Sequence, residues 1–124
     1  MTDVFANDFT VIIGNSHEQT FNVVDVDEAG AETPPPAAGS TWIFRAVKGR
    51  TELLRLTSAD AIDNDADGVV VVFLTAAQTR LIPKARTVRY ELERRWTGVG
   101  GRSEERTYSG GYITGIGGDN DDAD

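Results

Sequence analysis

The stretch that most constrains the fold is residues 68–94, GVVVVFLTAAQTRLIPKARTVRYELER. It contains two runs in which every second residue places an apolar side chain on the same face, which is the period of a β-strand with a buried face. These residues are Val70, Val72 and Leu74 in the first run and Val88, Tyr90 and Leu92 in the second. The pattern predicts two strands.

A short helix is predicted between these two strands. Thr75 is followed three residues later by Gln78, the spacing of a capping box at a helix N-terminus. Pro83 cannot continue a helix, so the helix must end at about Ile82. The segment therefore reads as strand, one or two turns of helix, and strand.

Five further runs have strand character and are separated by Gly, Pro, Asn and Asp. They are residues 9–13, 19–26, 41–47, 52–56 and 103–113. We expect Trp42 at the centre of the core, a polar connection at 58–67, a long Pro-rich loop at 27–40 and a hairpin tip at 98–101. The total of about seven strands predicts an all-β, immunoglobulin-like (Ig-like) β-sandwich with one short helix between two late strands.

Length and composition fit one domain. A chain of 124 residues can bury one core, and 13 glycines with several short apolar runs favour strands over long helices. We assign residues 1–116 to the sandwich and 117–124 to an acidic, Gly- and Asp-rich tail. The absence of cysteine excludes disulfides and thiolate metal sites.

The strand–helix–strand unit resembles the Ig-like domain of tailed-bacteriophage tail and baseplate proteins, in which a G-x-V-x-I-x-L-T strand leads into a short helix and a Y-x-L-E strand. The matching residues are Gly68, Val70, Val72, Leu74, Thr75, Ala76, Ala77, Gln78, Thr79, Tyr90, Leu92 and Glu93. Further similarity lies at Thr20, Phe21, Val23, Gly39, Phe44 and residues 109–113. The chain departs from the family pattern at Pro34–Ala38 and in its acidic C-terminus.

The resemblance implies a non-enzymatic virion structural protein, in a tail or baseplate, that mediates subunit contacts or fibre attachment. A capsid decoration protein that stabilises the head lattice is an alternative. A calcium- or carbohydrate-binding module, with Trp96 or Tyr108 as a stacking platform, is a third. The sequence shows no signal peptide and no run of apolar residues long enough to span a membrane, so we expect assembly in the host cytoplasm and residence in the virion.

Charge is distributed unevenly along the chain, although its sum is −8. Residues 1–44 hold seven acidic residues and no Lys or Arg, whereas residues 80–106 hold eight basic and four acidic residues. Copies could therefore stack head to tail, or the charges could pair within one chain or face water. The overall acidity argues against nucleic-acid binding. We expect other virion proteins or further copies of the chain as partners, and no membrane.

Chemical sites are weakly indicated. Asp63, Asp65 and Asp67 match the first half of a calcium loop, but position 74, where a bidentate Glu is needed, holds Leu74. We therefore predict no metal and no cofactor. The one histidine, His17, lies in a predicted turn, and neighbours in sequence do not make a catalytic triad, so we predict no enzyme activity.

Two segments are predicted to contact partners. Val69, Val71 and Phe73 give the strand before the helix a second apolar face, which must be covered by the short helix, the Pro-rich loop or another subunit. The Pro-rich loop itself, at Pro34, Pro35 and Pro36, is the second candidate contact.

Overall fold

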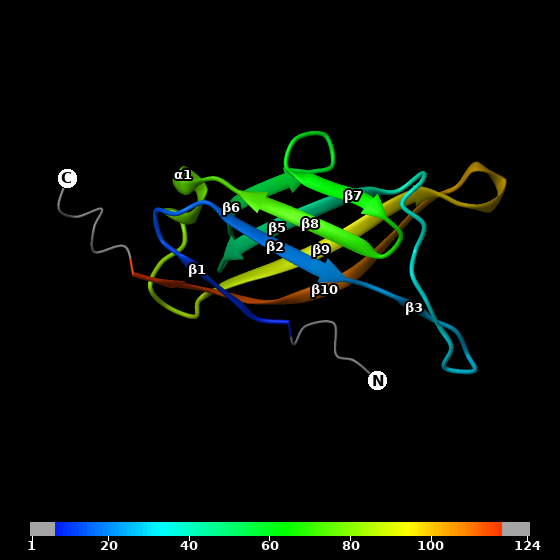
Figure 1. The fold of residues 1–124 in the computed structure, drawn as a ribbon, viewed down its shortest axis with the longest axis horizontal. Helices are drawn as coiled ribbons and strands as arrows, with labels where there is room; N and C mark the ends of the chain where they lie inside the picture. The colour runs from blue at the N-terminus through cyan, green and yellow to red at the C-terminus, as the bar shows by residue number, and fades with distance from the viewer. Residues whose placement is uncertain (1–6, 118–124) are drawn as a thin grey trace.

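The computed structural model describes residues 7–117, and these form two facing β-sheets (Figure 1). The larger sheet has the strand order β1-β10-β9-β5-β6, and the smaller has the order β2-β8-β7. The strands of the larger sheet are β1 (Phe9–Ile12), β10 (Ser103–Ile116), β9 (Val88–Thr97), β5 (Thr41–Lys48) and β6 (Thr51–Thr57). Those of the smaller sheet are β2 (His17–Asn22), β8 (Val69–Leu74) and β7 (Ile62–Ala66).

The strand order is that of an Ig-like sandwich, which confirms the predicted fold class. The series β10-β9-β5-β6 follows the G-F-C sheet extended by C′, and β2-β8-β7 follows the B-E-D sheet. All neighbours in these two series pair antiparallel, while β1 pairs in parallel with β10 at the outer edge of the larger sheet.

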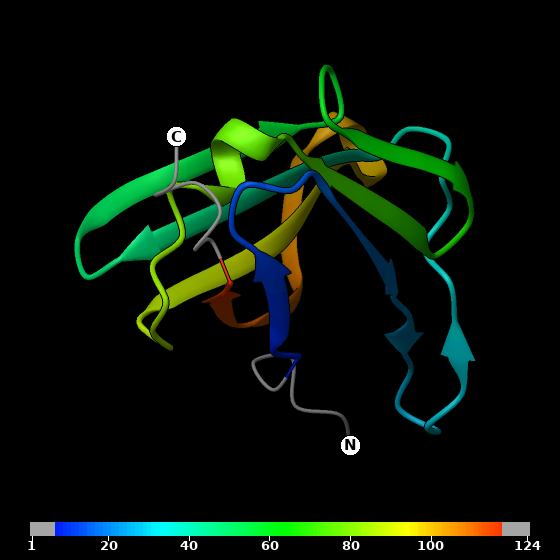
Figure 2. The same ribbon diagram turned by 60° about the vertical axis from the view of Figure 1, so that its left-hand side comes forward.

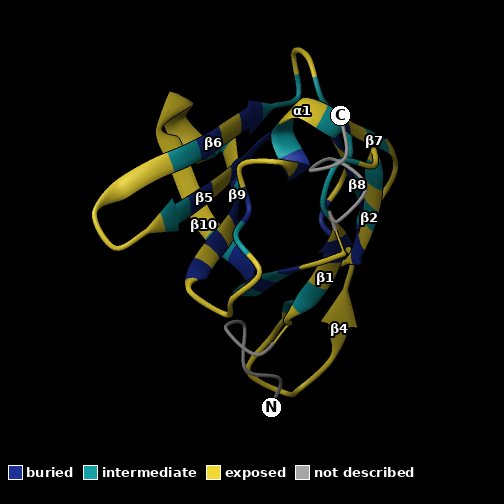
Figure 3. Cartoon of the chain, turned by 90° about the vertical axis from the view of Figure 1, so that its left-hand side faces the viewer, coloured by how far each residue is buried: buried dark blue, intermediate teal, exposed yellow. Residues whose placement is uncertain are grey.

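The core lies between the two sheets, and its buried residues are the dark-blue segments of the strands in Figure 3. Trp42 is fully buried, as expected for the centre of the core, and its ring meets Tyr108 edge to face at 5.4 Å. Phe44 and Tyr90, from neighbouring strands, stack at 5.3 Å. The predicted alternation on β8 and β9 is also confirmed, because its apolar members are all buried.

The short helix α1 (Ala76–Thr79) is present with its predicted capping box. The Thr75 hydroxyl accepts from the Gln78 backbone N–H at 3.1 Å, and the Gln78 side chain accepts from the Thr75 N–H at 2.9 Å. Buried Thr79 accepts from the Gly14 N–H at 3.0 Å and donates to the Asn15 carbonyl at 2.9 Å. The helix therefore holds the turn between β1 and β2.

Two of the expected connections contain strands. The polar connection predicted at 58–67 is wrong, since it includes β7, which pairs with β8. The sequence of this strand, IDNDA, lacks the apolar alternation that marks a strand, and Ile62 is its one buried residue. The Trp42 indole N–H donates across the sandwich to the Asn64 Oδ1 of β7 at 2.8 Å.

The predicted strand at 19–26 is divided in the structure. It forms β2 and, after a break, the short strand β3 (Asp25–Val26), which pairs with β4 (Glu32–Thr33) inside the expected loop. Figure 2 shows this two-stranded β3–β4 ribbon extending beyond the sheets. The hairpin tip between β9 and β10 is confirmed and carries the 3-10 turn η1 (Val99–Gly101). The predicted C-terminal tail lies, except for Gly117, outside the described residues.

Candidate protein-interaction site

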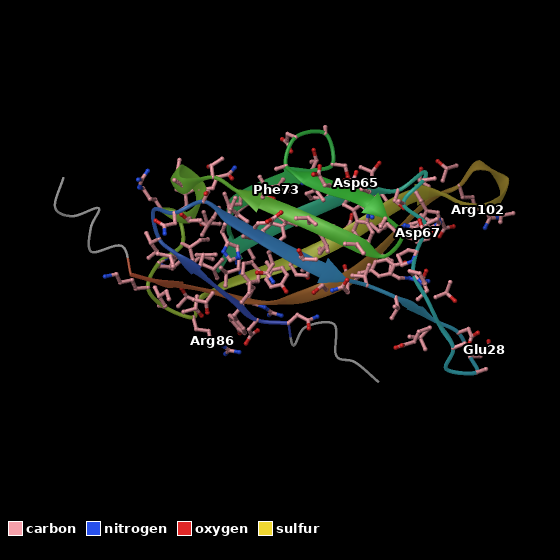
Figure 4. The ribbon with its side chains drawn as sticks, in the orientation of Figure 1. Glu28, Asp65, Asp67, Phe73, Arg86 and Arg102 are labelled. Carbon is pink, nitrogen blue, oxygen red and sulfur yellow. The ribbon has the colours of Figure 1, made fainter. Side chains whose placement is uncertain are left out.

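The outer face of β8 carries the predicted second apolar face. Val69 and Val71 are half-buried, and Phe73 is 38% exposed (Figure 4). Register places Glu18, Thr20 and Asn22 of β2 beside these three residues, and all three are exposed. The apolar stripe of β8 is therefore bordered by polar side chains, as is common at protein contacts.

The Pro-rich segment is attached to one end of β8. The Gly68 N–H donates to the Pro35 carbonyl at 3.0 Å, and the Ala37 N–H donates to the Asp67 carboxylate at 2.8 Å. Pro35 is buried, whereas Pro34 and Pro36 are exposed. Of the three prolines predicted to contact a partner, Pro35 is thus occupied within the domain, and Pro34 and Pro36 remain available beside the start of the stripe.

A groove of about 1210 Å³ opens along the other edge of β2. Its walls come from β2 and the β3–β4 ribbon on one side, and from residues 7–8 with Tyr108 and Ser109 of β10 on the other. Val24 and Val26, which are 41% and 61% exposed, lie in it. This groove was not predicted from the sequence. The one sequence feature that points to it is the pair of valines at alternate positions, Val24 and Val26, in an acidic run.

The aspartates of the calcium-like motif do not form a metal site. Across residues 7–117, no group of three or more His, Cys, Asp or Glu side chains lies close enough together to hold a metal ion. Asp63 and Asp65 are exposed on β7, and the Asp67 carboxylate accepts from the Ala37 N–H. Figure 4 labels Asp65 and Asp67. The residues are therefore better explained by a strand and its turn.

His17 occupies a structural position. It begins β2 and does not lie in the predicted turn; its ring stacks on Phe9 at 5.6 Å, and its Nε2 lies 2.9 Å from the Gln19 Oε1. Tyr108, one of two suggested carbohydrate platforms, is buried, and its hydroxyl donates to Asp25 at 2.5 Å. Burial raises the pKa of Tyr108, and the bond to Asp25 raises it further. A buried ring cannot stack on a sugar.

Arg94 is a charged residue within the sandwich. It is buried, its Nε donates to the Ser40 hydroxyl at 2.7 Å, and its guanidinium lies 4.2 Å from the centre of the Trp96 ring. This packing covers one face of Trp96, the second suggested carbohydrate platform.

The acidic and basic segments of the sequence meet within one chain. Asp8 pairs with Arg86 at 2.7 Å, and Asp25 pairs with Arg106 at 2.8 Å. The hydrogen bond from Arg86 lowers the pKa of Asp8, and the backbone N–H of Tyr112 lowers it further. The uneven charge distribution therefore leads to ion pairs within one chain at these two contacts.

Comparisons with known proteins give no family. No protein-family model matches the chain, and no curated protein matches it. One solved structure, the V domain of amphioxus IgVJ-C2, is 14% identical; the alignment covers 87% of this chain and 99% of that one, with a TM-score of 0.26. A TM-score of 0.26 does not establish a shared fold, whereas the order of the strands in the two sheets is that of an Ig-like domain. Within residues 7–117, no helix has the length and apolar character needed to cross a bilayer.

Proposed function

We propose that the chain is a non-enzymatic structural protein of a tailed-bacteriophage particle, acting in the tail or baseplate to join neighbouring subunits. The resemblance of residues 68–94 to tail and baseplate Ig-like domains supports the phage setting. The observation that carries the adhesive role is the stripe formed by Val69, Val71 and Phe73 on the outer face of the smaller sheet.

The exposure of Phe73 makes an internal structural role insufficient to explain the stripe. Phe73 lies in the middle strand of its sheet and is 38% exposed, so part of its apolar surface is in water. A partner that covered this surface would gain the free energy of burying a large aromatic ring. Pro34 and Pro36 lie at the end of the same strand and extend the surface. The partner would be a second copy of the chain or another virion protein.

The proposal is tested with Phe73→Asp and light scattering. We expect the wild-type protein to form a defined oligomer of its 13.4 kDa chain and the variant to remain monomeric. The melting temperature should change little, because an exposed position leaves the new carboxylate hydrated. Leu81→Asp is the matched control, since Leu81 is 50% exposed outside the stripe, and it should leave the oligomer intact.

The other outcomes are also informative. A Phe73→Asp variant that keeps the wild-type mass, or one that unfolds, would contradict a contact role for the stripe. A wild-type protein that is monomeric, with or without calcium, would favour a decoration role on a preformed capsid, because the partner would then supply the second surface. A melting temperature raised by calcium would instead support a calcium-dependent binding module.

A further inference from the structure

One edge of β2 has no neighbouring strand among the described residues. β2 pairs with β8 on one side, and the smaller sheet ends there. The Val23 N–H donates to the Gly68 carbonyl at 2.8 Å, and the Phe73 N–H donates to the Ala61 carbonyl, away from β2. Backbone groups alternate in direction along a strand, so Glu18, Thr20 and Asn22 direct their N–H and C=O groups to the open edge.

This edge has little of the usual protection against strand addition. Natural edge strands are commonly blocked by Lys or other charged side chains, by Pro, by a bulge or by a covering loop, and on β2 Glu18 is the one acidic side chain. β2 has the sequence HEQTFN, with neither Pro nor Lys, and its pairing with β8 is regular over all six residues. The edge can therefore accept a second extended chain through backbone hydrogen bonds.

The groove described above runs along this same edge. Gln19, Thr20, Phe21 and Asn22 of β2 all line it. Val24 and Val26 continue the line as exposed apolar side chains. An added strand would find backbone partners on β2 and apolar contacts on Val24 and Val26.

The charge of the groove selects the incoming chain. Its lining includes four carboxylates, and the described residues that line it include no Lys or Arg. Asp8 is already paired with Arg86. Asp27, Glu28 and Glu32 form no ion pair within residues 7–117, and Glu28 lies at the outer end of the β3–β4 ribbon in Figure 4.

We propose that the open edge of β2 is a docking site for an extended, basic segment of another polypeptide, which adds as a strand. Main-chain bonds to Glu18, Thr20 and Asn22 would supply affinity, apolar side chains would contact Val24 and Val26, and Lys or Arg side chains would face the ribbon. The edge adjoins the β8 stripe, since Glu18, Thr20 and Asn22 border it, but it offers backbone groups and not apolar side chains, and the proposal does not depend on a phage setting.

The test is fluorescence anisotropy with a labelled synthetic peptide in which valine and lysine alternate over the length of β2. We expect saturable binding to the full chain, weakened by added salt because the ribbon carboxylates are exposed. A valine–glutamate peptide of the same length should bind about tenfold or more weakly. The valine–lysine peptide, N-methylated at alternate residues, should lose a similar factor, since it cannot complete the backbone ladder.

Two protein variants locate the site. Thr20→Pro removes an N–H that faces the open edge and spares the ladder to β8, so the fold should survive while binding falls by about tenfold or more. The double variant Glu28→Lys with Glu32→Lys leaves β2 unchanged and should also weaken binding, which keeps the test valid if Thr20→Pro does not fold. Asp63→Lys with Asp65→Lys, on exposed positions of β7, is the matched charge control and should bind more tightly than the ribbon variant.

Three results would overturn the proposal. The first is no binding of the valine–lysine peptide by the full chain. The second is equal binding of the glutamate peptide, which would show that charge does not select. The third result has two parts: the ribbon variant and the β7 charge variant lose binding equally, and the N-methylated peptide binds as well as the unmethylated one. Together these would indicate general attraction of a basic peptide to an acidic protein.

Discussion

At the scale of single residues, Gly68 is the most constrained backbone position beside the β8 stripe. Its φ is +73°, and an added Cβ would lie 2.6 Å from the Pro34 Cβ and 2.8 Å from the Val23 carbonyl oxygen. We expect Gly68→Ala to lower the free energy of unfolding by about 3 kcal/mol, from left-handed strain and the clash together. Urea denaturation measures this. Gly39→Ala is the control, because Gly39 has a φ of +76° with no atom within 4 Å, and strain alone should cost about 1 kcal/mol there. Equal losses would show that the Pro34 contact is unimportant.

At the scale of elements, Asn64 fastens β7 to the rest of the sandwich. Its Oδ1 accepts from the Trp42 indole, and its Nδ2 donates to the Ala66 and Val69 carbonyls at 3.0 and 2.9 Å. Asn64→Ala leaves the buried Trp42 N–H without its acceptor, so we expect the free energy of unfolding to fall by about 2 kcal/mol. The backbone amides of β7 should also exchange hydrogen faster. Asp65→Ala, on the same strand but exposed, should change neither quantity. An unchanged exchange rate in the Asn64 variant would contradict this role.

At the scale of the whole molecule, Asp8 connects three segments that are distant in sequence. Its carboxylate accepts from Arg86, in the connection between α1 and β9, and from the Tyr112 N–H of β10 at 2.9 Å, while Asp8 itself leads into β1. Because these bonds lower its pKa below the ordinary value of 3.8, its contribution to stability is present above that pH and is lost as the pH falls through the folded-state pKa. The stability difference between wild type and Asp8→Asn should therefore be largest at neutral pH and shrink in acid. In an Arg86→Gln background the difference at neutral pH should be smaller, because the largest cause of the lowered pKa is absent. A difference that grows on acidification would contradict the assignment.

The candidate site was only partly predictable. The stripe of Val69, Val71 and Phe73 follows from one strand's sequence, because alternate residues of any strand occupy opposite faces. The burial of Pro35 and the open edge of β2 could not be predicted, since both depend on which segments lie beside them. The spacing of Asp63, Asp65 and Asp67 is likewise local information. Convergence on a cation requires a fold that brings carboxylates together, and among residues 7–117 no such group of three forms.

The sequence by itself determined the strand–helix–strand unit, the capping box of Thr75 and Gln78, and Trp42 as a core residue, because periodicity, capping and size act through near neighbours in the chain. Only the tertiary structure decided that a polar segment becomes β7, that acidic and basic segments meet at Asp8–Arg86 and Asp25–Arg106, and that a groove opens beside β2. Each of these depends on contacts between residues far apart in sequence, whose energies appear only when the two sheets are packed.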